Sequence, residues 1–297
     1  MFLSSSNADQ SNSDWHGLDC LGGTAAGSVL PFGLVPEDSH GIQRLPHPSL
    51  ALSTESPSLS ASNGAREMKF VVADDVAQTI MAWARQHLAA DPHVDESEDG
   101  YHVNSLYLDT LGFDTYRRLP GFRRRKFRLR RYGQEAMIWL EVKRKRSGNV
   151  RKRRVSVAET NLIERLTQPA DSEWEGAWFR RRLDTRQLRP VCQVMYRRFA
   201  RVGMSVTGPI RLTIDSDLFA TDADDWQIPL ASPFGAPQRG VPLLNGRRIV
   251  ELKFRDVLPA AFRGLIQDLR LAPSSFSKYR ESVAACIPLS RLTGECV

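Results

Sequence analysis

The sequence predicts an α+β protein, in which about eight strands form an antiparallel β-barrel tunnel with a charged lumen and peripheral helices. Short runs rich in β-branched and aromatic residues recur along residues 67–254, and turns rather than helical crossovers join most of them. Charged and apolar side chains alternate within these runs. The third observation is the charge balance, because bases greatly outnumber acids in the middle of the chain.

The expected strands follow one another with short connections. We place them at residues 67–72, 103–108, 126–132, 137–145, 153–157, 190–201, 210–214, 226–229 and 249–254. Five helices are expected, at residues 74–90, 158–167, 173–183, 259–271 and 276–286. In the first helix, apolar residues recur every three or four positions from Val76 to Leu88, which indicates one buried face. Pro259 is suited to open the fourth helix.

Residues 1–64 differ from the rest of the chain. They are rich in Ser, Gly, Asn and Pro, and they carry six acids and one base, a net charge of −5. Such a segment buries too little apolar surface to offset its ordering entropy, so we expect a disordered tail followed by one domain at residues 65–290. The whole chain is +7. The part after the tail therefore has a net charge of +12, which indicates a polyanionic partner.

Strand side chains alternate between the two faces of a sheet, and this alternation shows which charged residues share a face. In residues 126–130 the bases Lys126, Arg128 and Arg130 share one face, while Phe127 and Leu129 lie opposite. The unit Glu-x-Lys occurs in three strands, at residues 67–69, 141–143 and 251–253. Any one strand of this kind is expected in an ordinary half-exposed sheet. Six such strands favour a charged interior instead.

The count over residues 117–154 supports this interpretation, because this stretch contains 17 bases and only two acids, Glu135 and Glu141. A packed apolar core cannot hold so many charges, whereas a wet lumen can if an anion neutralises it. The apolar strand faces would then point outward, beneath the helices. Asp109 and Asp215 are expected to pair with arginines of the lumen. For the basic run at residues 151–154, an exposed hairpin and a binding rim both remain open.

Nine short motifs in this order resemble the VTC domain, a polyphosphate polymerase domain of the CYTH-like or triphosphate tunnel metalloenzyme superfamily. They are EMKF (67–70), SLYLD (105–109), FRLRRYG (127–133), LEVK (140–143), RPV (189–191), YRR (196–198), RLTID (211–215), VELK (250–253) and FSKY (276–279). The resemblance implies metal-dependent phosphoryl transfer that builds inorganic polyphosphate from the γ-phosphate of ATP.

The resemblance also implies roles for individual residues. The positively charged residues that take part in catalysis would be Lys69, Arg128, Arg130, Lys143, Arg198 and Arg211. Substrate binding would involve Ser277, Lys278, Lys253, Tyr196 and Glu141. Glu251 would hold Mn²⁺ or Mg²⁺. The related phosphatases begin with Glu-x-Glu-x-Lys, but this chain has Ala65 at the first acidic position, which favours the polymerase.

Two alternatives remain open at this stage. The chain could be a triphosphatase that hydrolyses triphosphate or polyphosphate, or a non-catalytic module that binds polyphosphate or an inositol polyphosphate. Nucleic acid is not an expected partner, because the aromatic side chains lie mainly opposite the charges. No P-loop motif and no apolar run long enough to span a membrane occur. We therefore expect a cytoplasmic enzyme, and the resemblance to the VTC domain implies membrane proteins as possible partners.

Overall fold

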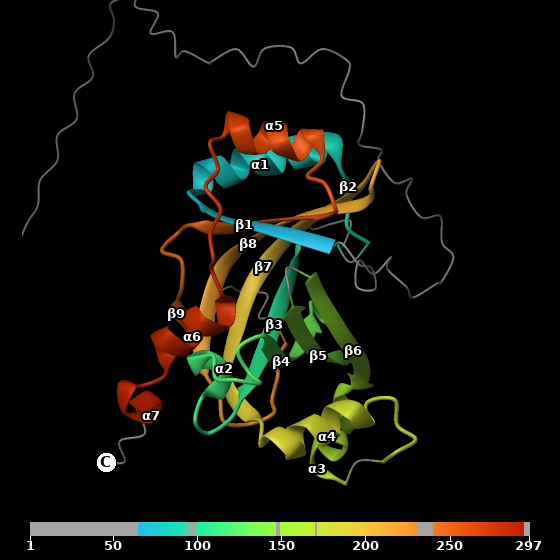
Figure 1. Ribbon diagram of the computed structural model, residues 1–297, viewed down its shortest axis with the longest axis vertical. Coiled ribbons are helices and arrows are strands. Elements are labelled where there is room, and N and C mark those ends of the chain that lie inside the picture. The colour runs from blue at the N-terminus through green and yellow to red at the C-terminus, as the bar shows by residue number, and fades with distance from the viewer. Residues whose placement is uncertain are drawn as a thin grey trace, which may run out of the picture. The chain divides into compact units, whose positions relative to one another are not determined.

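The computed structural model describes residues 65–92, 94, 99–146, 149–169, 171–230 and 240–293. All of them belong to one unit, residues 39–297. The tail expected at residues 1–64 lies outside the described residues, so its disorder stays a prediction. In the described part of the chain, helices surround one large antiparallel sheet (Figure 1). The α+β class is therefore confirmed.

Over the described ranges the sheet has ten strands, more than the sequence predicts. They are β1 (Ala65–Val72), β2 (Ala89–Ala90), β3 (Tyr101–Asp109), β4 (Arg125–Tyr132), β5 (Met137–Arg146), β6 (Asn149–Ala158), β7 (Arg189–Ser205), β8 (Gly208–Asp222), β9 (Val241–Pro242) and β10 (Arg248–Arg255). Eight of them lie in the order β1-β10-β8-β7-β3-β4-β5-β6, while β2 pairs with β7 and β9 pairs with β8. The two-residue strands β2 and β9 are too short to leave a periodic pattern in the sequence.

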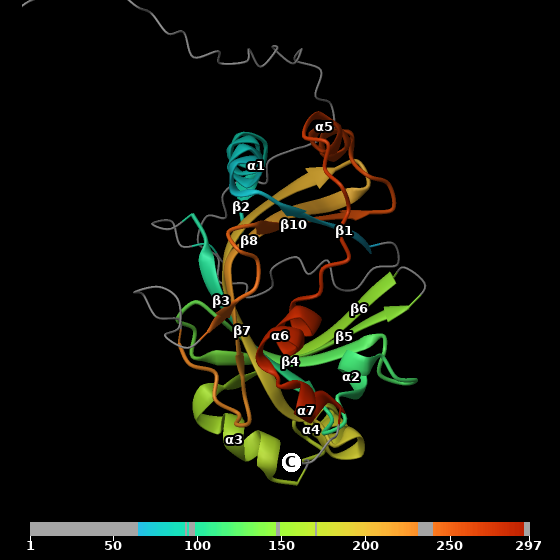
Figure 2. The same ribbon diagram turned by 90° about the vertical axis from the view of Figure 1, so that its left-hand side faces the viewer.

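The sheet curls so that its two ends approach each other. Glu67 on β1 lies 3.1 Å from the Nζ of Lys143 on β5, although five strands separate β1 from β5 in the sheet order. Figure 2 shows β1 and β10 facing β5 and β6. Among the described residues no backbone ladder joins β1 to β6, so the closed barrel is not detected. The curl nevertheless gives the sheet an inner and an outer face.

In the residues that the structure describes, seven helices accompany the sheet. They are α1 (Asp74–His87), α2 (Asp114–Arg117), α3 (Glu159–Thr167), α4 (Ala177–Arg186), α5 (Ala260–Asp268), α6 (Lys278–Cys286) and α7 (Leu289–Thr293). Pro259 is the N-cap of α5, as its position in the sequence suggests. The first helix ends earlier than predicted, at His87, because the next residues leave the helix and Ala89 and Ala90 pair with β7.

Two other expectations about elements were wrong. The helix expected at residues 173–183 begins at Ala177 and runs to Arg186, because a turn occupies residues 174–176. Residues 226–229 form no strand. Side chains take the place of a backbone ladder there, since Arg131 donates to the carbonyl of Ile228 at 3.0 Å and Asn104 donates to that of Pro229 at 3.0 Å.

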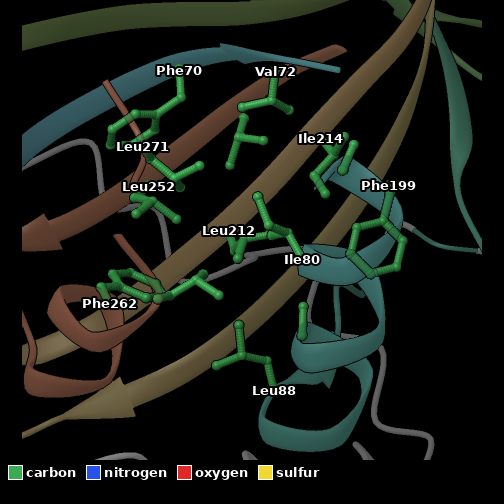
Figure 3. Packing of buried hydrophobic residues seen from close by; sticks show 14 of the residues in the cluster. Phe70, Val72, Ile80, Leu88, Phe199, Leu212, Ile214, Leu252, Phe262 and Leu271 are labelled. Atoms are coloured by element: carbon green, nitrogen blue, oxygen red, sulfur yellow. The ribbon is translucent and has the colours of Figure 1, made fainter. Parts of the chain in front are cut away.

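The apolar strand faces point outward and are covered by helices, as predicted. Figure 3 shows Phe70, Leu212 and Leu252 of the sheet gathered with Ile80 of α1 and Phe262 of α5. Figure 1 shows α1 and α5 side by side over this end of the sheet. Burying each such side chain contributes roughly 1.5–3 kcal/mol. The outer face is thus a hydrophobic core, which leaves the inner face free to be polar.

A second outer cluster lies at the other end of the sheet. Leu129 and Leu140 pack there against Leu162 of α3 and Phe179 of α4. On the inner face, α6 packs against β7 and β8, and its Tyr279 and Val283 belong to a buried apolar cluster. The helix fills part of the inner face with apolar side chains. It also brings its first turn, which begins at Lys278, to the charged strands.

Candidate functional site

The inner face carries a dense set of ionised side chains, which we call the charged face. Among the described residues, and together with the first turn of α6, it includes ten bases: Lys69, Lys126, Arg128, Arg130, Lys143, Lys152, Arg198, Arg211, Lys253 and Lys278. Five acids contact them: Glu67, Asp91, Glu141, Asp215 and Glu251. The formal excess is five positive charges. All residues that the sequence marked as the site, including Ser277 and Tyr196, lie in or beside this set.

Three lysines stand side by side on three neighbouring strands of the charged face. The register pairs Lys126 on β4 with Lys143 on β5, and Lys143 with Lys152 on β6. Like charges in register repel, so this row raises the local positive potential. Burial lowers the pKa of Lys126 to about 7, and the charges of Lys69 and Lys143 act in the same direction. An anion near this row would restore the proton.

Two residues before Lys143 on β5, the charged face has a buried carboxylate. Glu141 is fully buried, and its Oε2 accepts from the Nε of Arg128 at 2.7 Å, while its other oxygen pairs with Lys152. Burial alone would raise the pKa of Glu141, but Arg128 and Lys152 outweigh it and hold that pKa well below its ordinary value. The carboxylate therefore stays ionised and fixes the guanidinium of Arg128. Its contacts are those of a residue that orients bases.

Arg130 lies deeper than Arg128 and has no acidic partner among the described residues. It is 4 % exposed, donates to the Oγ of Ser105 at 2.9 Å, and lies 5.7 Å from the ring centroid of Tyr132. A buried guanidinium held only by neutral groups keeps its full charge. Arg130 is thus a fixed positive charge on the inner face.

A buried triad of charges joins β7, β8 and α6. Asp215 accepts two hydrogen bonds from Arg198, at 2.7 and 2.8 Å, and one from the Nζ of Lys278 at 2.5 Å. Burial opposes ionisation of Asp215, but Arg198 and Lys278 lower its pKa. The prediction that Asp215 pairs with an arginine of the inner face is confirmed. The triad fixes the start of α6 against the sheet.

Tyr196 lies beside this triad. The ammonium of Lys278 is 4.8 Å from its ring centroid and the guanidinium of Arg198 is 5.3 Å away, distances typical of cation–π contacts. Its hydroxyl is buried and has no hydrogen-bond partner among the described residues. A buried hydroxyl without a partner is uncommon, because leaving it unpaired costs free energy. The hydroxyl of Tyr196 therefore has unused hydrogen-bonding capacity.

At the β1 end, one ammonium bridges two carboxylates. The Nζ of Lys69 lies 3.1 Å from Glu67 and 2.9 Å from Glu251. Burial and Glu251 oppose ionisation of Glu67, but Lys143 and Lys69 outweigh them and hold its pKa at about 2. Burial also opposes ionisation of Glu251, yet Lys69 and Lys278 keep its pKa far below the ordinary value. Both carboxylates are therefore ionised and share one cation.

This pair of carboxylates is the part of the charged face that suits a divalent metal. Among the described residues, no three His, Cys, Asp or Glu side chains form a group that could hold a metal ion. Mg²⁺ and Mn²⁺ nevertheless commonly take one or two carboxylates and complete their shell with water and phosphate oxygens. Glu67 and Glu251 both contact the ammonium of Lys69, so they are close enough to fit such a site. The sequence predicted Glu251 as a metal ligand, and Glu67 is a second candidate.

Two further bases complete this end of the charged face. Arg211 pairs with Asp91 at 2.8 Å and donates to the hydroxyl of Tyr101 at 3.0 Å. Lys253 lies 3.8 Å from Glu251. Burial lowers the pKa of Lys253 to about 7, although Glu251 favours its charged form. Lys253 resembles Lys126 in this respect, since both lose their charge near neutral pH.

Ser277 connects the lysine row to α6. It is the N-cap of this helix, and its Oγ accepts from the backbone N–H of Arg280 at 3.3 Å and from the Nζ of Lys126 at 2.8 Å. Serine is a preferred N-cap residue because its hydroxyl satisfies a free backbone donor. The same hydroxyl thereby places the helix start beside β4. This contact brings Ser277 into the site, where the sequence expected it.

The prediction for Asp109 was wrong. Its carboxylate accepts from the backbone N–H groups of Thr115 and Tyr116, at 2.9 and 3.0 Å, and from the hydroxyl of Tyr279. It therefore caps the turn that holds α2 and anchors α6, and no hydrogen bond or ion pair joins it to an arginine in the described part of the chain. A short acidic side chain at a strand end serves nearby backbone donors more readily than distant bases.

The sequence analysis also missed members of the charged face. Lys126 and Glu67 were placed on charged strand faces but were given no role in the site. Lys152 was left between an exposed hairpin and a binding rim, and its pairing with Glu141 places it in the charged face. The alternation of strand side chains every two residues is the sequence feature from which all three could have been found. Asp91 follows β2, which is too short to show a pattern, so no sequence signal pointed to it.

Comparison with known proteins identifies the family. The model of the VTC domain matches residues 64–287. The search of curated proteins found no match. In the described residues no helix is long and apolar enough to cross a membrane.

Solved structures were also compared with the chain. An adenylate cyclase candidate from Bacillus halodurans has 13% identity and a TM-score of 0.44, with 72% of this chain and 96% of that chain covered. An adenylyl cyclase candidate from Hippeastrum with a dominant triphosphatase activity has 13% identity and a TM-score of 0.41, with 79% and 98% covered. An adenylate cyclase candidate from Vibrio parahaemolyticus has 14% identity and a TM-score of 0.41, with 76% and 100% covered. Since the family model spans most of the sequence, the chain belongs to the VTC domain family.

Proposed function

We propose that the charged face binds a chain of phosphates and transfers the γ-phosphoryl group of ATP to the end of an inorganic polyphosphate. One observation carries this proposal. Among the described residues, the ten bases named above contact five acids on the inner face of a curled sheet, and a low-dielectric surface of this kind needs an anion to neutralise it. Membership of the VTC domain family supports the same substrate class.

The geometry of the arginines suits phosphate. A guanidinium donates two parallel hydrogen bonds to a phosphate, and it does so best when other contacts already hold it in place. Glu141 fixes Arg128 in this way, and Asp215 fixes Arg198. Fixed positive charges of this kind stabilise the charge that spreads over the transferred phosphoryl group. The chain's own contribution is therefore alignment and electrostatic stabilisation.

No strong general base is required for this reaction, because a phosphate acceptor is ionised at neutral pH. In the proposed reaction, Lys69, Glu67 and Glu251 lie where a metal would meet the phosphates. Mn²⁺ or Mg²⁺, when bound by the two carboxylates, would neutralise phosphate oxygens and orient them. Ala65, which stands where tunnel phosphatases have an acid, favours transfer to phosphate over transfer to water. We place the enzyme in the cytoplasm, where ATP is its donor.

The test is incubation of the full chain with ATP and Mn²⁺ or Mg²⁺, followed by gel analysis of polyphosphate length and an assay for orthophosphate. The proposal expects long chains, and it expects none from an Arg128→Ala, Arg130→Ala double variant. Arg263→Gln is the matched control, because Arg263 is exposed on α5, on the outer side of the sheet.

Other products would change the assignment. Orthophosphate without chains would make the protein a triphosphatase, for which two metal-binding carboxylates are a favourable feature. If neither product forms but polyphosphate or an inositol polyphosphate binds with dependence on Arg128 and Arg130, the protein is a binding module. Unchanged phosphate affinity in the double variant would refute the charged face as the site.

A further inference from the structure

A row of arginines lies on the outer face of the sheet, at the same end as the lysine row. Arg125 on β4 pairs in register with Arg144 on β5, and Arg144 pairs with Arg151 on β6. We call these three residues the arginine row. Because side chains alternate along a strand, each of these arginines points away from its neighbour in the lysine row. The same three strands therefore carry two parallel rows of bases, one on each face.

No acid neutralises the arginine row in the described part of the chain. No hydrogen bond or ion pair joins the side chain of Arg125, Arg144 or Arg151 to another described residue. Arg144 and Arg151 are exposed, and Arg125 is half-buried. Like charges directly opposite each other in an antiparallel pair destabilise the sheet. Three in succession without a counter-charge are typical of a surface that binds an anion.

The surroundings of the arginine row are basic as well. Arg123 and Arg124 are exposed immediately before β4. On the side toward α4, the guanidinium of Arg153 lies 4.3 Å from the ring centroid of Trp178. Arg186 covers Phe122 in the same way, at 4.8 Å. These rings are covered by bases, so they do not offer the open stacking platforms on which single-stranded nucleic acids depend.

We propose that the arginine row is a second binding site, which holds a stretch of a long inorganic polyphosphate chain outside the charged face. This inference rests on the proposed function, since it assigns the extra site to the same substrate class. Neighbouring strands lie about 4.8 Å apart, so the three guanidinium groups span roughly 10 Å. That spacing suits a flexible polymer with one negative charge per phosphate, and each guanidinium can bind two phosphate oxygens.

The position of the arginine row indicates how it acts on a bound polyphosphate. The lysine row consists of Lys126, Lys143 and Lys152. Each of these lysines is the direct sequence neighbour of one arginine of the arginine row, so both rows lie near the same strand ends. A polyphosphate held at the lysine row needs only to pass these ends to reach the arginine row. The second site then keeps a long product attached while its end is in the charged face. Short phosphates cannot use both sites at once, so the site distinguishes chain length.

The test compares the full chain with a triple variant, Arg125→Gln, Arg144→Gln and Arg151→Gln, in the absence of ATP. The affinity for long-chain polyphosphate should fall about tenfold at low salt, because the variant loses three ion pairs with phosphates and each ion pair at a protein surface is weak. The slope of log affinity against log salt should fall by about two to three. Tripolyphosphate binding should be unchanged, which also shows that the variant is folded.

Two further variants make the result specific. A triple Arg→Lys variant at the same positions keeps the charges and should retain most of the long-chain affinity. The matched control replaces three exposed arginines elsewhere, Arg66, Arg247 and Arg263, by glutamine and should bind like the wild type. Equal loss in this control would overturn the proposal, since it would show a non-specific charge effect.

Other outcomes also overturn it. An equal loss of tripolyphosphate and long-chain affinity would mean that the variant damages the charged face. A loss of affinity for an RNA oligomer or for anionic phospholipid vesicles, with polyphosphate binding intact, would assign the row to that partner. The readout is binding without turnover, so a protein that makes no polyphosphate but shows row-dependent binding would refute the proposed function alone.

Discussion

Replacing two lysines of lowered pKa by arginine, Lys126→Arg with Lys253→Arg, should remove their share of the proton uptake that accompanies phosphate binding. Burial lowers both lysine pKa values from 10.5 to about 7. A phosphate placed beside them favours the charged form and raises these pKa values again. Binding to the wild type therefore takes up protons. Arginine keeps its charge at every accessible pH, so positions 126 and 253 have no proton to take up in the variant.

The magnitude follows from the two pKa values. Lowering a lysine pKa from 10.5 to about 7 corresponds to about 5 kcal/mol against the charged form. At pH 7 about half of each lysine is neutral, so the two together take up about one proton, and nearly two at pH 8.5. Above pH 7 the affinity of the wild type should fall by up to about tenfold per pH unit for each lysine.

The free protein should show the opposite trend. Between pH 7 and 10.5 the unfolded chain holds protons on these two lysines that the folded chain has lost. Their unfavourable effect on the folded state is full below pH 7 and disappears as the pH rises toward 10.5. The free energy of unfolding of the wild type should therefore rise relative to that of the variant as the pH increases from 7 to 10.5, and urea unfolding of both proteins measures this change.

The assay for binding is calorimetry with tripolyphosphate, in two buffers of different ionisation enthalpy, at several pH values. The ligand itself also titrates, but its contribution is the same for both proteins and cancels in the difference between them. A difference near zero at pH 8 would refute the reasoning, because it would mean that the lysines are charged before phosphate binds or do not contact it.

Three other changes test the remaining structure. Asp215→Asn leaves Arg198 and Lys278 buried without their carboxylate, so urea unfolding should show a loss of about 3–5 kcal/mol, and tripolyphosphate should restore part of it; a loss below about 1 kcal/mol would contradict the buried triad. Glu251→Gln should lower metal-dependent turnover at least about tenfold, while tripolyphosphate binding without metal persists; unchanged turnover would exclude Glu251 as a ligand. Phe70→Ala should cost about 3–5 kcal/mol, because Phe70 is fully buried on the outer face, and native-state affinity for tripolyphosphate should not change.

The faces of the strands could be predicted from the sequence because alternation is a local property. Consecutive side chains of an extended chain point to opposite sides whatever the strand pairs with. For this reason Glu251 and Lys253, or Arg128 and Arg130, could be placed on one face without a structure, as could the helices that cover the apolar face. The excess of bases on that face then indicated an anionic ligand.

The partners of each charge could not be predicted in the same way. Arg128 and Glu141 meet because β4 pairs with β5, but Glu67 reaches Lys143 only because the sheet curls. Asp109 lies on a charged strand face as Asp215 does, and it binds backbone N–H groups instead. Sequence alternation contains no information about which of these contacts forms.

The sequence by itself therefore determined the composition of the site: which bases share a face, and that an anion is the ligand class they suit. Only the tertiary structure decided the pairing, for example that Lys69 bridges Glu67 and Glu251, or that the arginine row faces away from the lysine row without an acid beside it. The physical reason is range. Alternation operates between neighbouring residues of one strand, whereas charges interact strongly only within a few ångströms in space, and strand order and curl set those distances.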